Sequence, residues 1–180
     1  MRAARDLLED GGPEALTMQA VADRVGVRAP SLYKHVSDRA ALVQAVLDSV
    51  LAELAAAIDI PHPGPDPRID LRRIARRYRG FVRANPAGYA LLFSTPLAGA
   101  TIRESVLADL GRPIVGAVAR LVGPDEALPA ARTFVAWAHG FVSMELAGAF
   151  RLGGDLDAAY AAGVEVILAG ISGRASPPPG

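Results

Sequence analysis

The sequence has no cysteine, few aromatic residues and no excess of charge of either sign. Nineteen basic residues offset nineteen acidic ones, and aromatic residues make up only 6% of the 180 positions. Without cysteine the chain cannot form a disulfide framework, a thiol nucleophile or a zinc-thiolate site. Because the net charge is zero, any affinity for nucleic acid must come from a local concentration of basic residues.

Hydrophobic residues are abundant, at 51% of the chain, and alanine and leucine supply many of them. This composition favours the packing of helices through small residues over a sandwich of β-branched strands. The N-terminal stretch "MRAARDLLEDGG" lacks the apolar core of a signal peptide, and His139 and Glu145 interrupt the most apolar stretch of the chain. We expect an all-α, soluble, cytoplasmic protein with no membrane partner.

Helical periodicity and helix-breaking residues predict about nine helices. Thr17 is a candidate N-cap of the second helix, and Gly26 ends that helix with a residue able to adopt a positive φ. Ser37 is the expected N-cap of a long fourth helix that runs to residue 58, with Asp38 favouring its positive end. The other expected helices span residues 2–10, 18–25, 29–36, 69–84, 101–122, 125–151 and 155–172, with a short one within 85–96.

The spacing of small residues between positions 18 and 39 indicates two helices that cross at a tight turn. Ala22 and Gly26 are four residues apart, where the two backbones would approach and bend, and Pro30 stands in the first turn of the next helix. This is the pattern of a helix-turn-helix, whose second helix lies in the DNA major groove. The alternative is a helical hairpin with a purely structural role.

The second helix of this motif should bury Leu32 and Val36 and expose a polar face. The exposed residues would be Arg28, Ala29, Ser31, Tyr33, Lys34 and His35, which can contact phosphates, base edges and a thymine methyl group. Residues 24 to 39 hold four basic side chains and one acidic one. A net charge of +3 neutralises few phosphates, so a single copy should bind DNA weakly and we expect a dimer.

The N-terminal segment resembles a known family. The stretch "LTMQAVADRVGVRAPSLYKHVSDRAALVQAV" is similar to the signature of TetR-type transcriptional regulators, and the resemblance extends over about residues 2–50. The stretch "FVAWAHGFVSMELAGAF" resembles the Trp-x-His-Gly segment of one C-terminal subclass, the WHG-type ligand-binding domain. The resemblance implies an all-helical homodimer that binds palindromic operator DNA, usually represses, and is released by a small-molecule effector.

The resemblance also implies roles for individual residues. Thr17, Tyr33 and Arg39 would contact phosphates. The remaining positions lie where the family reaches backbone or bases: Gln19, Arg28, Ala29, Pro30, Ser31, Lys34 and His35. Two alternatives stay open, because Tyr33 could be a core tyrosine and His35 could cap a helix.

A proline-rich segment at residues 59–68 separates the first four helices from the rest of the chain. We expect a helix-turn-helix DNA-binding domain at residues 1–47, a helical ligand-binding and dimerisation domain at 48–173, and a disordered tail at 174–180. Within the larger domain, Arg72, Arg76, Arg79 and Arg83 form an arginine stripe on one helix. The stripe could be a second DNA surface or a solvated face that pairs with carboxylates.

The last two helices are apolar on more than one side, which favours their pairing with a second copy in a four-helix interface. The candidate interface residues are Val142, Leu146, Phe150, Tyr160, Val164, Ile167, Leu168 and Ile171. Aromatic walls with a polar anchor are typical of effector pockets. The pocket candidates are Tyr78, Phe81, Tyr89, Phe93, Trp137, His139 and Met144, each of which could instead be a core residue.

The pattern of an enzyme is missing. The histidines stand at positions 35, 62 and 139 with no metal-ligand or nucleophile-base spacing, so we expect no catalytic residues, no metal and no cofactor. The favoured hypothesis is a ligand-responsive transcriptional regulator, a repressor that binds double-stranded operator DNA as a homodimer. The alternative is a helical small-molecule-binding or scaffold protein that keeps the fold without operator binding.

Overall fold

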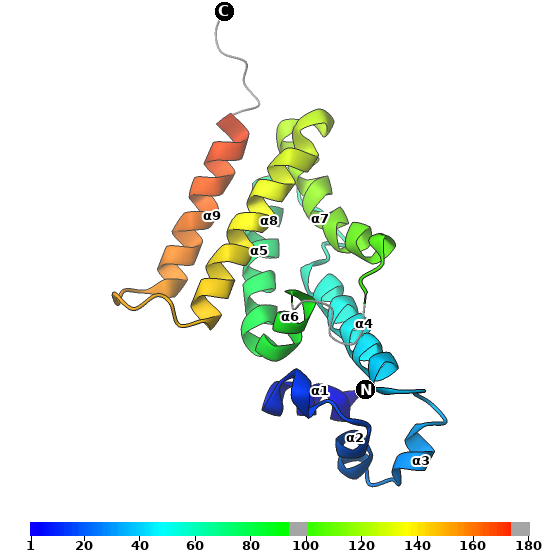
Figure 1. The fold of residues 1–180 in the computed structure, drawn as a ribbon. Coiled ribbons are helices and arrows are strands. Elements are labelled where there is room, and N and C mark those ends of the chain that lie inside the picture. Colours follow the sequence, from blue (N-terminus) through cyan, green and yellow to red (C-terminus); the bar gives the residue numbers. More distant parts are fainter. Residues whose placement is uncertain (94–100, 174–180) are drawn as a thin grey trace, which may run out of the picture. The chain divides into compact units, whose positions relative to one another are not determined.

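The protein is described by a computed structural model that covers residues 1–93 and 101–173 (Figure 1). Within these residues the structure contains nine α-helices, one short 3-10 helix (η1) and no strands, which confirms the all-α prediction. In chain order the elements are α1 (Arg2–Gly11), η1 (Pro13–Ala15), α2 (Met18–Val25), α3 (Ala29–Leu32), α4 (Arg39–Ile58), α5 (Pro67–Ala84), α6 (Pro86–Phe93), α7 (Glu104–Val122), α8 (Pro124–Leu146) and α9 (Leu156–Gly173).

Helix α8 ends about five residues earlier than the hydrophobic pattern predicts. Gly148 adopts a φ of 62°, and its N–H donates to the carbonyl of Glu145 at 3.0 Å. The N–H of Ala149 donates to the carbonyl of Met144 at 2.9 Å. These two bonds form a Schellman motif, which satisfies the last carbonyls of the helix and turns the chain away from it.

The start of α4 also differs from the prediction, because Asp38 and not Ser37 caps it. The Asp38 carboxylate accepts a hydrogen bond from the N–H of Ala41 at 2.8 Å. The Ser37 hydroxyl donates to the other carboxylate oxygen of Asp38 at 3.3 Å. A carboxylate at this position satisfies an orphan N–H and interacts with the positive end of the helix dipole.

The chain divides into two compact units that are not continuous in sequence. The first unit comprises Met1–Ala56 and Ala84–Ala108, and the second comprises Ala57–Arg83 and Asp109–Gly180. These units do not divide the chain at residue 47, because the first unit extends along α4 to Ala56 and includes α6, which packs with α1. The division by function therefore stays a prediction, and the expected tail at 174–180 lies outside the described residues.

In the first unit, polar side chains of α1 join it to α6. The carboxylate of Glu9 accepts hydrogen bonds from the N–H groups of Ala87 and Gly88, at 2.9 and 2.8 Å. Both donors belong to the first turn of α6, where a negative charge is favoured. One turn earlier on α1, the guanidinium of Arg5 donates to the Asn85 side chain at 2.7 Å. These bonds fix where α6 begins.

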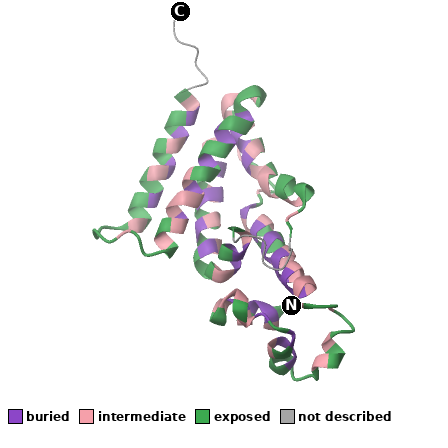
Figure 2. Cartoon of the chain, in the orientation of Figure 1, coloured by how far each residue is buried: buried purple, intermediate pink, exposed green. Residues whose placement is uncertain are grey.

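The apolar core of the first unit is built around α4. Its residues from Leu42 to Leu54 repeat at helical spacing and turn one broad face inward, visible as the purple face of α4 in Figure 2. Leu8 of α1, Leu16 of the following loop, and Val21 and Ala22 of α2 are also buried in this unit. The residues that position the helix-turn-helix therefore belong to this core.

In the second unit, one buried arginine of α5 joins three helices. Arg79 is only 8% exposed, and its guanidinium donates to both carboxylate oxygens of Glu145, at the end of α8, at 2.8 Å each. It also pairs with Asp157, at the start of α9, at 2.8 Å. Its guanidinium carbon lies 4.9 Å from the ring centroid of Tyr160, a cation–π geometry. The hydrogen bond with Glu145 raises the pKa of Arg79, which therefore stays charged although it is buried.

A second ion pair between α5 and α9 lies at the surface. Arg72 donates two hydrogen bonds to Glu165, at 2.6 and 2.7 Å, and this bonding lowers the pKa of Glu165. Because the folded pKa lies below the unfolded one, the pair stabilises the protein fully above the unfolded pKa of the carboxyl, and this stabilisation is lost as the pH falls through the folded pKa. The side chains are 42% and 52% exposed, so the contribution is small.

A buried carboxylate ties the proline-rich linker to two helices of the same unit. Asp70 of α5 is 1% exposed, and it accepts a hydrogen bond from the Gly64 N–H at 3.1 Å. Arg120 of α7 donates to the same carboxylate at 3.0 Å and also donates to the Gly64 carbonyl. The linker is thereby held by α5 and α7, and the buried charge of Asp70 is paired with Arg120.

The two ion pairs should differ strongly in their contribution to stability. We expect Arg79→Gln to lower the free energy of unfolding by about 3 kcal/mol, because it leaves the partly buried Glu145 carboxylate without its main partner. The matched variant Arg72→Gln, which breaks the exposed pair, should cost less than about 1 kcal/mol. Urea denaturation followed by circular dichroism measures both values, and equal losses would contradict the assigned role of Arg79.

Candidate functional site

The turn between α2 and α3 has the backbone geometry that the sequence predicts. Thr17 caps α2, since its hydroxyl oxygen accepts a hydrogen bond from the N–H of Ala20 at 3.1 Å. At the other end, Gly26 adopts a left-handed conformation with φ 78°. The N–H of Val27 donates to the carbonyl of Ala22 at 3.0 Å, and that of Gly26 to the carbonyl of Asp23 at 3.2 Å. This Schellman motif reverses the chain and delivers it to α3.

Helix α3 is shorter than the predicted 29–36. Regular helix spans Ala29–Leu32, and the chain continues as a turn in which the N–H groups of His35 and Val36 both donate to the carbonyl of Leu32. The orientation nevertheless matches the prediction, because Leu32 and Val36 are half-buried and the residues between them are exposed. The exposed side chains of this reading segment, residues 28–35, are Arg28, Pro30, Ser31, Tyr33, Lys34 and His35, while Ala29 is half-buried.

The exposure of the reading segment decides between two alternatives for Tyr33 and His35. Tyr33 is 52% exposed, so it is not a core tyrosine. The His35 imidazole makes no hydrogen bond to a helix end within the described residues, so the hypothesis that His35 caps a helix has no support there. Both side chains are therefore available to a partner, and so is Lys34, the single lysine of the chain.

Two other candidate DNA contacts are already engaged inside the protein. The Arg39 guanidinium donates to the carbonyls of Leu16 and Pro13, both at 2.9 Å, and so holds the start of α4 against the loop before α2. The Gln19 amide donates to Asp23 at 2.7 Å. Thr17 keeps its hydroxyl proton for another acceptor, because the capping bond uses only a lone pair. The phosphate contacts of these residues stay predictions.

The local positive charge is smaller than the sequence count indicates. Arg24, one of the four basic side chains counted, lies 3.0 Å from the Asp10 carboxylate of α1. Both side chains are well exposed, so the pair is screened but still reduces the field at this surface. Arg28, Lys34 and His35 remain as the exposed basic groups of the reading segment.

The seven predicted effector-pocket residues do not belong to one unit. Tyr89 and Phe93 lie on α6 in the first unit, with ring centroids 5.0 Å apart. The other five belong to the second unit, where the Trp137 ring stacks on Tyr160 at 5.2 Å. The His139 Nδ1 lies 3.5 Å from the Ser143 hydroxyl, and Met144 is 48% exposed. A common pocket formed by these seven residues stays a prediction.

Five of the eight residues predicted to form the dimer interface have little exposed surface in a single chain, and the interface itself stays a prediction. Val142, Tyr160, Val164, Leu168 and Ile171 are buried within a single chain, because α8 and α9 turn these side chains toward their own unit. They have almost no surface to present to a partner. Leu146 is exposed, whereas Phe150 and Ile167 are half-buried.

The second unit contains further exposed apolar side chains on the same two helices, of which only Leu146 belongs to the predicted interface. On α8, Leu128, Val135 and Leu146 are spaced so that they share one side of the helix, and on α9, Val166 is 70% exposed. Sequence periodicity missed Leu128, Val135 and Val166, because both helices are apolar nearly all round and the pattern does not identify the inner side.

The arginine stripe on α5 is mainly a surface of ion pairs. Arg72 and Arg79 pair with carboxylates as described above, and Arg83 lies 3.3 Å from Asp157. The alternative that the stripe pairs with carboxylates is therefore confirmed for three of its four members. Among residues 1–93 and 101–173 there is no cluster of three or more histidine, aspartate or glutamate side chains placed to hold a metal ion.

A helix-turn-helix with an exposed reading segment, together with a helical second unit, places the protein in the class of helix-turn-helix proteins. Residues 1–46 match the family model described as bacterial regulatory proteins, tetR family. Residues 71–167, more than half of the chain, match the model described as tetracyclin repressor-like, C-terminal domain. The chain therefore belongs to the TetR family of regulatory proteins, which also confirms that it is not an enzyme. The Trp-x-His-Gly subclass stays a prediction.

Similar proteins and structures agree with this assignment. An HTH-type transcriptional regulator of Mycobacterium tuberculosis is 30% identical over 119 residues, which is 63% of this chain and 50% of that protein. The class A tetracycline repressor from transposon 1721 of Escherichia coli is 38% identical over 79 residues, covering 44% of this chain and 36% of that protein. The chain thus spans about half the length, or less, of these curated relatives.

Among solved structures, a TetR variant from Acinetobacter baumannii in complex with minocycline is similar, with a TM-score of 0.71 and 25% identity, over 98% of this chain and 96% of that one. A protein from a Rhodococcus species has a TM-score of 0.78 at 25% identity, over 94% and 91% of the two chains. These likenesses extend over both units.

The turn at Gly26 gives a direct test of the helix-turn-helix geometry. We expect Gly26→Ala to lower the free energy of unfolding by about 1 kcal/mol, because a side chain disfavours the left-handed conformation, although no atom lies within 4 Å of the added Cβ. The matched control is Gly116→Ala in α7, which also meets open space but has helical geometry and should stabilise by about 0.5–1 kcal/mol. Urea denaturation measures both, and a stabilising Gly26→Ala would contradict the assigned geometry.

Proposed function

We propose that this protein is a sequence-specific DNA-binding transcriptional regulator, a repressor that a small-molecule effector releases from palindromic operator DNA. The observation that carries this proposal is the reading segment, residues 28–35, which follows a tight turn and exposes polar and basic side chains. Their donors suit phosphates and the base edges of the major groove. Membership of a family of regulatory proteins supports the same reading.

The way the reading segment is supported favours a binding role over a structural one. Leu32 and Val36 anchor it on one side, and the backbone bonds at Gly26 fix its approach. Tyr33, Lys34 and His35 contribute little to the core and face solvent. Because exposed side chains on a rigid support are typical of binding surfaces, we place the DNA contacts there.

The effector part of the proposal rests on the second matched region and on a relative. Residues 71–167 resemble the C-terminal domain of tetracycline repressors, and the similar Acinetobacter TetR variant is in complex with minocycline. An effector that binds one arrangement of the protein better than another shifts the population toward it and changes operator affinity. As a regulator of bacterial DNA, the protein would act in the cytoplasm.

We also propose that the protein is a homodimer paired through α8 and α9. By length and composition, α4 and α9 are the two described helices long and apolar enough to cross a membrane. The apolar side chains of α4 lie largely in the core, whereas α9 is mostly exposed, and appears green over much of its length in Figure 2. A second copy would cover this apolar surface together with Leu128, Val135 and Leu146 of α8.

Lys34 should be required for DNA binding and dispensable for folding. We expect Lys34→Ala to weaken binding to the DNA that flanks its own gene by about tenfold and to reduce the slope of log K against log[salt] by about 1, as the loss of one phosphate contact predicts. Footprinting across a salt series measures the affinity and the slope. The double variant with Tyr33→Ala should abolish protection.

The control for this experiment is Arg112→Ala, an exposed residue of α7 that pairs with Asp109. It removes the same charge from another surface and should leave the footprint unchanged. Absence of any protected site at low salt, with the protein folded and dimeric, would contradict the regulator and favour a helical small-molecule-binding protein. A protected site without two-fold symmetry would contradict the dimeric mode.

Val166 tests the proposed dimer surface. We expect Val166→Glu to raise the dimer dissociation constant by tenfold or more, because a buried unpaired carboxylate costs more than about 1.4 kcal/mol. Sedimentation velocity at micromolar concentration measures the change. The control Leu107→Glu, at an exposed position of α7, should leave the dimer intact, and a concentration-independent monomer for the wild-type chain would overturn the proposal.

A further inference from the structure

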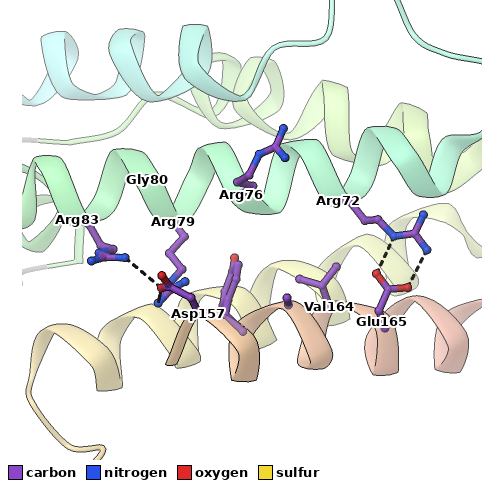
Figure 3. Close-up of a pocket in the computed structure, with 10 residues that line it drawn as sticks. Arg72, Arg76, Arg79, Gly80, Arg83, Asp157, Val164 and Glu165 are labelled. Carbon is purple, nitrogen blue, oxygen red and sulfur yellow. Dashed lines mark hydrogen bonds and ion pairs between the residues drawn. The ribbon is translucent and has the colours of Figure 1, made fainter. Parts of the chain in front are cut away.

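The second unit contains a pocket that none of the predicted effector residues lines. It has a volume of about 480 Å³ and lies between α5 and α9. Figure 3 shows the arginine stripe and Gly80 of α5 on one side and residues of α9 on the other. The volume lies within the range of about 300–1,000 Å³ that is typical of small-molecule sites.

Positive charge exceeds negative charge around this pocket. The four arginines of the stripe line the pocket together with Asp157 and Glu165, and Glu145 pairs with Arg79 beside it. Four guanidinium groups against three carboxylates leave one positive charge in excess. The excess falls on Arg76, which is exposed and has no ion pair or hydrogen bond with any described residue.

Arg76 differs from its neighbours in direction as well as in pairing. Figure 3 shows the side chains of Arg72 and Arg79 directed toward α9, where they meet carboxylates, whereas that of Arg76 turns away from α9. A long, unpaired arginine can rotate about its side-chain bonds and bring its guanidinium over the pocket. Arginine pairs with a carboxylate through two parallel hydrogen bonds, so a single anionic group would satisfy it.

The floor of the pocket is apolar. Tyr160 and Val164 are nearly buried, and each contributes an edge to the pocket beside the exposed Ala161. Gly80 stands opposite, in the C-terminal part of α5, where an added Cβ would meet no atom within 4 Å. A glycine inside a helix is unfavourable relative to alanine, and here the missing side chain keeps the pocket open.

We propose that this pocket binds an amphipathic organic monoanion, a monocarboxylate with a hydrocarbon body. Its carboxylate would pair with Arg76, and its hydrocarbon body would cover Tyr160, Ala161 and Val164. A phosphate group of higher charge fits less well, because the other three arginines are already paired with carboxylates. The inference goes beyond the proposed function, because it names a binding site and a chemical class of ligand. Binding is measured on the free protein without DNA, so it is tested separately from operator binding.

The protein contains its own reporter for this site. Trp137 is the only tryptophan of the chain, and its ring stacks on Tyr160, a residue of the pocket floor, at 5.2 Å. A ligand that covers Tyr160 changes the polarity next to the indole. Tryptophan fluorescence therefore follows binding directly, and calorimetry gives the stoichiometry.

The test is a titration of the full chain with decanoate, with decanol as the neutral probe of equal length. We expect saturable binding of decanoate with one site per chain and at least tenfold weaker binding of decanol. Arg76→Gln should weaken decanoate binding about tenfold and leave decanol unchanged, while Arg76→Lys should give an intermediate affinity, because it keeps the charge but loses the two parallel hydrogen bonds. Gly80→Leu should block both probes by filling the pocket.

The control is Arg112→Gln, which removes one positive charge from α7 outside the pocket and should not change the titration. Circular dichroism checks that each variant is folded; if Gly80→Leu is not, the exposed Arg76→Gln decides. Unsaturable decanoate binding, equal affinity for the two probes, or wild-type affinity in Arg76→Gln would each overturn the proposal. A failed footprint with intact decanoate binding would reject the regulator and leave this site standing.

Discussion

The packing of the second unit depends on the buried guanidinium of Arg79. A charged group that is 8% exposed must be paired, and its partners stand at the end of α8 and the start of α9. The same arginine lies over the Tyr160 ring, which in turn stacks on Trp137. Three helices are therefore brought together around one cation, and the aromatic cluster packs against it. The pocket between α5 and α9 is a consequence of this arrangement.

The reading segment of the first unit is held by hydrogen bonds to the backbone and not by a buried ion pair. Its conformation is set by backbone hydrogen bonds at Gly26 and by the Arg39 side chain, which ties α4 to the loop before α2. The side chains between Leu32 and Val36 contribute little to the core. A surface built this way can change its polar residues, and with them its target, at little cost in stability. Rigid support combined with replaceable contacts suits a binding surface.

Much of the fold could be predicted because the relevant signals are local. Three features depend on a few neighbouring residues each: the Thr17 cap, the positive φ of Gly26 and the helical spacing of apolar residues along α4. Two helix boundaries were nevertheless predicted wrongly, although their signals are also local. The apolar pattern continues to Phe150, yet α8 ends at Leu146 because Gly148 takes a left-handed conformation. Asp38 displaced Ser37 as the cap, since both residue types are suitable and only the geometry distinguishes them.

The sequence by itself determined the helical class, the helix-turn-helix and the residues that form the reading segment, because periodicity, caps and turns act over short distances. Only the tertiary structure decided which side of α8 and α9 faces inward, since both helices are apolar nearly all round. It also decided which arginines of the stripe are neutralised, because the partners of Arg72 and Arg79 lie more than sixty residues away in the sequence. Long-range pairing of this kind leaves no periodic signal in a single sequence.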